Sequence, residues 1–344
     1  MKTMANTMAG CALVLALFVG CAPGGELSPT PAPVRAQAAA YVVAPTPCGP
    51  ATVGSLRELL PDAEITGALE LDVAHLRRGK LFPEVERLLK AEGAEVLTAM
   101  DECGVPLSKV EGLVAAFSEG DHMMVGVRAK GLGEPATLDC LATKIEKATG
   151  KSPWKRVTGT CDTTLELPDG DAKGFVVGHD MLVVASKSLE AAMDRRVAGK
   201  DRSALDGRLA WARKEVDMGN TAWIATNVPA SAAAGLPASM TGVSHVGVSI
   251  DATKGLGLRL GAGFSSASEA KAARAELETQ LVQMKAVLPL MGLPASVGDT
   301  IEVDAKGSLL RMGMFLKLSD IEALRTAVTG GAQQEKASPP SPGM

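Results

Sequence analysis

The chain has 344 residues and a formal net charge of −4, and aromatic residues make up only 3% of it. This balance excludes the basic field that nucleic-acid binding needs, and the shortage of aromatic side chains excludes a base-stacking platform. The composition, 46% hydrophobic and rich in Ala and Gly, favours a globular protein whose core rests on aliphatic side chains.

The N-terminus is typical of an export signal. Lys2 precedes an apolar run over residues 8–19, which is long enough for a secretory signal but too short to span a bilayer. The run ends in Leu-Phe-Val-Gly-Cys at residues 17–21, where the small residue Gly20 precedes Cys21. This arrangement resembles the lipobox of bacterial lipoprotein precursors.

The resemblance implies that residues 1–20 are a signal peptide and that lipid on Cys21 holds the mature protein to a membrane. Ala22 follows the cysteine, which in that family implies sorting to the outer membrane, so we expect a location in the cell envelope. Over most of its length the chain also loosely resembles uncharacterised envelope lipoproteins of GC-rich Gram-negative bacteria, a likeness that implies no known activity. The alternative is ordinary signal-peptidase cleavage at Ala-Gln-Ala, residues 36–38, with Cys21 as a bystander.

Segments that cannot build a core flank the body of the chain. Residues 21–53 are rich in Pro, Gly, Ala, Ser and Thr, a composition that favours extended polyproline II conformation. We interpret this segment as a tether between the lipid and the folded part. Residues 331–344 hold Gln, Ser, Pro and Gly and are expected to be a disordered tail.

The folded part runs twice through one pattern of elements, and period-two alternation of apolar residues identifies its strands. Each half shows a strand, a helical stretch, a hairpin and a second helix. In the first half we expect the strand at 68–73, the helical stretch at about 79–102, the hairpin at 110–118 with 122–130, and the second helix at 135–149. In the second half we expect the strand at 222–228, the helical stretch at about 229–239, the hairpin at 242–250 with 255–263, and the second helix at 266–287. We therefore expect an α+β fold in which residues 54–200 and 201–330 are a tandem duplication of a β-α-β-β-α-β, ferredoxin-like unit, with extra strands and a closing helix in each half. The alternative is that alternating helices and strands match by chance.

Four cysteines remain outside the signal and the lipid site, at positions 48, 103, 140 and 161. An even number in an exported protein predicts two disulfides. In a split βαβ unit the two helices run antiparallel on one face, so the end of the first helix, at Cys103, lies near the start of the second, at Cys140. The expected pairs are therefore Cys103–Cys140 and, by elimination, Cys48–Cys161.

Two glycine motifs come close to nucleotide-binding signatures without matching them. Residues 131–136, Gly-Leu-Gly-Glu-Pro-Ala, resemble a dinucleotide fingerprint. The strand before them belongs to a hairpin, however, and no acidic residue ends the next strand. Gly150-Lys151-Ser152 follows a helix and lacks the first glycine of a P-loop, so Gly150 is interpreted as a helix stop.

The four histidines, at 75, 122, 179 and 245, form no metal-binding or catalytic motif. We therefore expect no catalytic residue, no cofactor and no metal site.

The leading hypothesis is a lipid-anchored envelope protein, not an enzyme, that binds or scaffolds an unknown protein partner on a membrane surface. The alternative is a periplasmic carrier of a small apolar ligand or lipid in a cleft between the two repeats, motivated by the Met-rich second half. A hydrolase with dispersed catalytic residues is a third reading. A deep apolar cavity would favour the carrier, and a large exposed apolar patch would favour a protein partner.

Overall fold

A computed structural model describes residues 55–63, 65–118, 122–159, 163–233, 238–291 and 295–323. The expected signal peptide (1–20), tether (21–53) and tail (331–344) lie outside the described residues. So do Cys21, Cys48 and Cys161.

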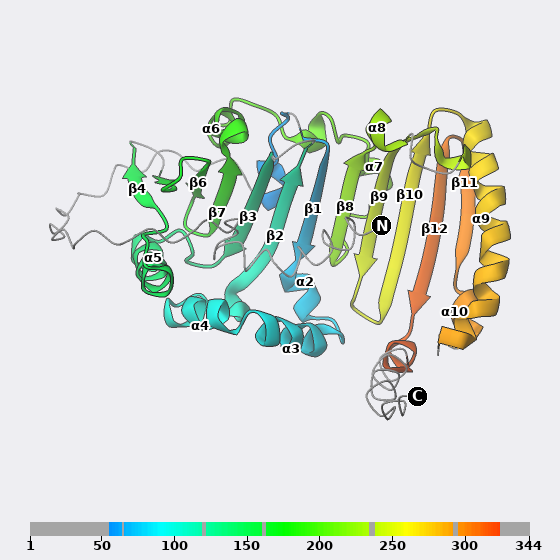
Figure 1. The fold of residues 1–344 in the computed structure, drawn as a ribbon, viewed down its shortest axis with the longest axis horizontal. Helices are drawn as coiled ribbons and strands as arrows, with labels where there is room; N and C mark the ends of the chain where they lie inside the picture. The colour runs from blue at the N-terminus through cyan, green and yellow to red at the C-terminus, as the bar shows by residue number, and fades with distance from the viewer. Residues whose placement is uncertain are drawn as a thin grey trace, which may run out of the picture.

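The described residues form one 12-stranded sheet in which every pair of neighbours is antiparallel (Figure 1). Its order is β11-β12-β10-β9-β8-β1-β2-β3-β7-β6-β5-β4. The strands are β1 Gly67–Asp72, β2 Val110–Phe117, β3 Met123–Ala129, β4 Lys155–Thr158, β5 Thr163–Glu166, β6 Ala172–Val177, β7 Met181–Ser186, β8 Ala222–Asn227, β9 Val243–Asp251, β10 Leu256–Phe264, β11 Glu302–Lys306 and β12 Leu309–Leu316.

The predicted hairpins are confirmed as β2–β3 and β9–β10. Strands β1 and β8 pair at the centre of the sheet and join its two halves. Each half begins as a three-stranded meander, β1-β2-β3 or β8-β9-β10, and then adds two later strands beside the third, β7-β6 or β12-β11. The first half alone continues outward with β5 and β4.

The α+β class is confirmed, but the ferredoxin-like order is not. In a split βαβ unit another strand separates the two strands that the first helix connects. Here β1 and β2 are direct antiparallel neighbours. Their connection is α2 Val73–Arg77, α3 Phe82–Glu92 and α4 Ala94–Glu102, which returns the chain to the adjacent edge of β1 instead of crossing to a more distant strand.

The single helix expected over about 79–102 is also divided. Gly93 has φ −123° and ψ 23° and separates α3 from α4, in keeping with the low helix propensity of glycine. Of the other expected helices, α5 Pro135–Thr149 and α9 Ala267–Val287 are confirmed. The stretch expected over about 229–239 shows, in its described residues, only the short α8 Ala230–Ala233 and a 3-10 turn at Ala238–Met240. Gly150 ends α5 in the left-handed conformation, with φ 73°, as its sequence position predicts.

Two helical layers cover the sheet. On one face, here called the helix face, α4 and α5 pack on the first half and α9 packs on the second. Figure 1 shows α9 along the β11 edge and α3 and α4 across one end of β1 to β3. The opposite face of the first half is buried under the 3-10 helix Leu56–Leu59, α6 Glu190–Val197 and the segment that leads into α7 Ala212–Glu215.

Candidate binding cavity

An apolar cavity of about 200 Å³ lies on the helix face of the first half, between the sheet and helices α2 to α5. All but two of its lining residues are apolar, the exceptions being Glu95 and Lys144. The apolar ones are Leu71, Val73, Leu76, Phe82, Val85, Leu89, Val96, Leu97, Ala99, Met100, Leu107, Val110, Leu113, Val127, Leu132, Leu141, Ile145, Ala148, Trp154 and Leu182.

The floor of the cavity is a row of side chains that crosses four neighbouring strands. Leu71 on β1 stands opposite Leu113 on β2, Leu113 opposite Val127 on β3, and Val127 opposite Leu182 on β7. Because alternate residues of a strand point to the same face, this register fixes one continuous aliphatic surface beneath the helices.

Helix α3 covers the cavity without packing closely on it. Phe82, Val85 and Leu89 line the cavity at the i, i+3, i+7 spacing of one helix face. No side chain described on α3 is buried, and Leu88 is 56% exposed. A helix with so few buried contacts opens at low free-energy cost, so α3 is the part of the wall best suited to let a ligand in.

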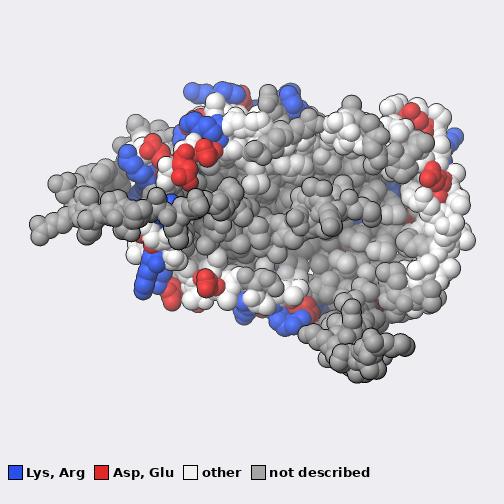
Figure 2. Space-filling model, in the orientation of Figure 1, with Lys and Arg blue, Asp and Glu red and all other residues white. Residues whose placement is uncertain are grey.

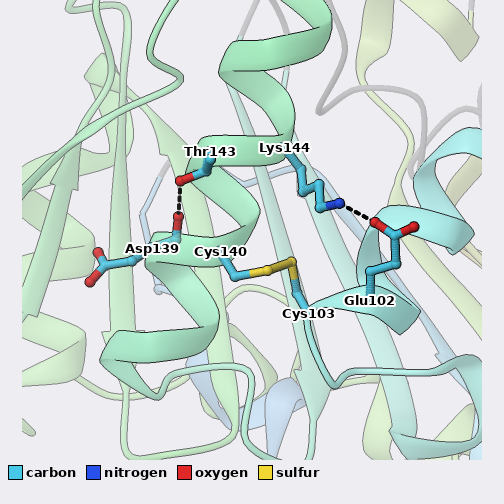
Figure 3. Close-up of a disulfide and its surroundings, with 6 residues drawn as sticks. All are labelled: Glu102, Cys103, Asp139, Cys140, Thr143 and Lys144. Carbon is cyan, nitrogen blue, oxygen red and sulfur yellow. Dashed lines mark hydrogen bonds and ion pairs between the residues drawn. A yellow bond between two sulfur atoms is a disulfide. The ribbon is translucent and has the colours of Figure 1, made fainter.

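Helices α4 and α5 form a second wall, which is cross-linked. The predicted disulfide Cys103–Cys140 is confirmed, with 5.6 Å between the two Cα atoms. Beside it the ammonium group of Lys144 donates a hydrogen bond to the Glu102 carboxylate (Figure 3). This contact holds the pKa of the Glu102 carboxyl below its usual value, with a further contribution from the charges of Lys144 and Lys147.

A second hollow, of about 360 Å³, lies over the outer strands of the second half. Its lining carries both signs of charge, including Arg259, Arg311, Glu302 and Asp304. Part of that charge is neutralised locally, since Arg259 lies 3.4 Å from the Asp217 carboxylate. Binding sites for small molecules are mostly apolar with a few placed polar groups, so the cavity under α3 is the better candidate.

The histidines do not come together as ligands. His245 bonds to Glu215 at 2.8 Å and its ring lies 4.2 Å from that of Trp211, so packing accounts for it. His122 contacts the Ser188 hydroxyl. Among the described residues there is no group of three or more His, Cys, Asp or Glu side chains placed to hold a metal ion.

The fingerprint-like glycines Gly131 and Gly133 lie in the turn between β3 and α5. Gly131 has φ 80° and its N–H bonds to the Asp180 carboxylate. A Cβ on Gly133 would lie 2.9 Å from the Gly178 carbonyl oxygen, so close approach of two backbones explains this glycine.

The cavity lies within the first half of the sheet, whereas the carrier hypothesis expected a cleft between the two halves. The helical stretch expected over about 79–102 forms α3 and α4, and its sequence pattern indicates an apolar face without indicating what that face covers.

On the face seen in Figure 2, Lys and Arg side chains and Asp and Glu side chains of the described residues both lie along the rim. Within the ranges described, no helix has the length and apolar character needed to cross a membrane.

No protein-family model matches the sequence, and no curated protein is detectably similar to it.

Proposed function

We propose that this protein is a non-enzymatic binding protein that holds a small apolar molecule, or part of a lipid chain, in the cavity under α3. The observation that carries the proposal is an apolar hollow with an aliphatic floor, closed on one side by a loosely packed amphipathic helix. A helix whose apolar face is left half-exposed is costly in water, and an apolar ligand would remove that cost.

The size of the cavity limits the ligand. An apolar cavity of roughly 150 Å³ is enough to bind benzene, so about 200 Å³ accommodates one ring or a short stretch of acyl chain. A longer chain, or a ligand with several rings such as a naphthylamine dye, requires α3 to move away from the sheet, and the non-helical Gly93 between α3 and α4 is a suitable hinge.

The proposed setting is the outer membrane of a Gram-negative envelope, with lipid on Cys21 as the anchor and residues 21–53 as the tether. Acylation suits this role because more than one lipid chain gives stable attachment. A carrier or receptor for apolar molecules gains from being held beside the membrane that supplies or accepts them.

We also infer that the two halves arose by duplication of a unit comprising a three-stranded meander, a helix and a hairpin. The orders β1-β2-β3-β7-β6 and β8-β9-β10-β12-β11 on either side of the β1–β8 pair support this inference, and β5 and β4 are additions to the first half. Between β8 and β9 the described residues form the short α8 Ala230–Ala233 and a 3-10 turn at Ala238–Met240, and among them there is no counterpart of the α3 cover. The proposed binding role therefore belongs to the first half.

Fluorescence titration with N-phenyl-1-naphthylamine, a neutral dye that brightens in apolar surroundings, tests the binding role. We expect saturable binding to the wild type and its loss in Ala99→Phe, because Ala99 lines the cavity and a phenyl ring there would fill it. Ala94→Phe is the matched control, since Ala94 lies on the same helix, is exposed and is not part of the lining. Unchanged dye binding in a folded Ala99→Phe variant would refute the proposal.

A further inference from the structure

The lining of the cavity includes one cation. Lys144 lies on α5 among Leu141, Ile145 and Ala148, all of which line the cavity. Its side chain is 40% exposed, so its methylene groups lie against the apolar wall while its ammonium group reaches solvent. An amphiphile whose chain occupies the cavity would bring its head group to this position.

The present partner of Lys144 can be exchanged. Glu102 is 51% exposed, and an exposed ion pair contributes only about 0 to 1 kcal/mol. The disulfide joins the residue after Glu102 to the residue one helical turn before Lys144, so it keeps the two elements together whether or not the ion pair forms. A ligand anion could therefore replace Glu102 without loosening the wall.

The position that the Glu102 carboxylate occupies already favours negative charge. Its hydrogen bond to Lys144 and the nearby charge of Lys147 both favour its ionised form. The other charged lining residue, Glu95, sits in the first turn of α4, where the helix dipole stabilises a carboxylate. The helix dipole thus partly balances the charge of Glu95, so Glu95 attracts a cationic head group less strongly.

We propose that the ligand of this cavity is a single-chain amphiphile with a carboxylate head group, whose chain lies beneath α3 and whose carboxylate takes the place of Glu102 on Lys144. This inference rests on the proposed binding function and adds the class of ligand. Recognition of the head group would select fatty acids over alcohols and cationic detergents of the same chain length.

Displacement of N-phenyl-1-naphthylamine by three C12 compounds tests the inference, with the two ionic compounds kept below their critical micelle concentrations and the alcohol kept below its solubility limit. The compounds are dodecanoate, dodecanol and dodecyltrimethylammonium. We expect dodecanoate to displace the dye from the wild type at the lowest concentration. Lys144→Gln should weaken dodecanoate by about fivefold, the equivalent of about 1 kcal/mol for one exposed ion pair, and leave dodecanol unchanged.

Two further variants sharpen the comparison. Glu102→Gln removes the competing carboxylate and should strengthen dodecanoate binding, whereas a merely structural role of the Glu102–Lys144 pair predicts weaker binding of all three compounds. Lys271→Gln, on the exposed side of α9 in the other half of the sheet, is the charge-matched control and should change nothing.

Equal displacement by dodecanoate and dodecanol, unaltered by Lys144→Gln, would overturn the head-group inference and leave the cavity proposal standing. Tighter binding of dodecyltrimethylammonium than of dodecanoate would also overturn it. Failure of the dye to bind the wild type would overturn the binding function and this inference together.

Discussion

Trp223 on β8 donates its indole N–H to the Glu70 carboxylate on β1, with 2.5 Å between Nε1 and Oε2. The two residues are direct cross-strand partners at the junction of the two halves. Both are buried, and the Arg57 guanidinium reaches the same carboxylate oxygen at 2.9 Å. A polar cluster of Glu70, Trp223 and Arg57 therefore joins the two halves on the face opposite the cavity.

Stability should depend on pH through Glu70. Burial raises the pKa of this carboxyl above its usual value, and the Arg57 charge and the Trp223 hydrogen bond offset only part of that effect. The folded state then binds the proton more tightly than the unfolded state does. The stability that this group contributes is full below its unfolded pKa of about 4.3 and is lost as pH rises through its folded pKa.

Urea denaturation of the wild type and of Glu70→Gln between pH 4 and 8 measures this effect. The free energy of unfolding of the wild type should fall relative to that of the variant as pH rises from about 4. A difference in unfolding free energy between wild type and variant that is the same at every pH does not bear on this test; only its change with pH does. A difference that stays flat across the range would show that Glu70 titrates alike in both states.

The disulfide should be a main support of the cavity wall. Cys103 and Cys140 are separated by 37 positions in the sequence, and closing a loop of that length restricts the unfolded chain by about 4 kcal/mol in the chain-entropy model. The Cys103→Ser/Cys140→Ser double variant should lose roughly 3 to 4 kcal/mol of unfolding free energy. Reduced wild type should behave like the variant, and equal stability of oxidised and reduced wild type would contradict the assignment.

Mass spectrometry of unreduced peptides checks the expected Cys48–Cys161 pair.

Two glycines on adjacent strands should respond oppositely to alanine. A Cβ on Gly263 would lie 2.0 Å from the His245 ring, which is held by Glu215 and Trp211, whereas a Cβ on Gly313 would meet nothing within 4 Å. Gly263→Ala should cost about 1 to 3 kcal/mol through overpacking. Gly313→Ala should be neutral or stabilise by about 0.5 to 1 kcal/mol, because glycine is unfavourable inside a strand. Thermal melts compare the two, and equal shifts would contradict the packing at His245.

Lipidation should depend on Cys21 alone. Metabolic labelling with radioactive palmitate in a Gram-negative host should label the wild type and place it in the outer-membrane fraction. Cys21→Ser should be unlabelled and leave that fraction, since the lipid is the expected anchor. Label that persists in Cys21→Ser would contradict the lipoprotein assignment, and cleavage after Ala38 would identify the alternative signal.

The local sequence pattern predicts the hairpins of this fold but not the pairing of strands that are distant in sequence. Alternation in residues 110–130 and 242–263 is enough to identify β2–β3 and β9–β10, because a hairpin's partners are close in sequence. The β1–β2 and β1–β8 pairs join residues much farther apart, and no local signal specifies them. The Cys103–Cys140 pair was still predicted correctly, because it requires only that the two helices share one face of the sheet.

The cavity could not be predicted for a similar reason. The pattern of Phe82, Val85 and Leu89 identifies an apolar helix face but not how far that face stands from the sheet. The distance depends on the break at Gly93 and on how α4 is held by the disulfide, and both become visible only in three dimensions.

Photo-crosslinking with a diazirine-bearing dodecanol tests the central claim most directly, because a neutral compound reports on the cavity independently of Lys144. After irradiation of the full-length protein and tryptic digestion, the label should lie on peptides from α3, α4, α5 and the segment around Trp154, and excess unlabelled dodecanol should remove it. Label concentrated on β9 to β12, or spread evenly along the chain and not removed by dodecanol, would contradict the account.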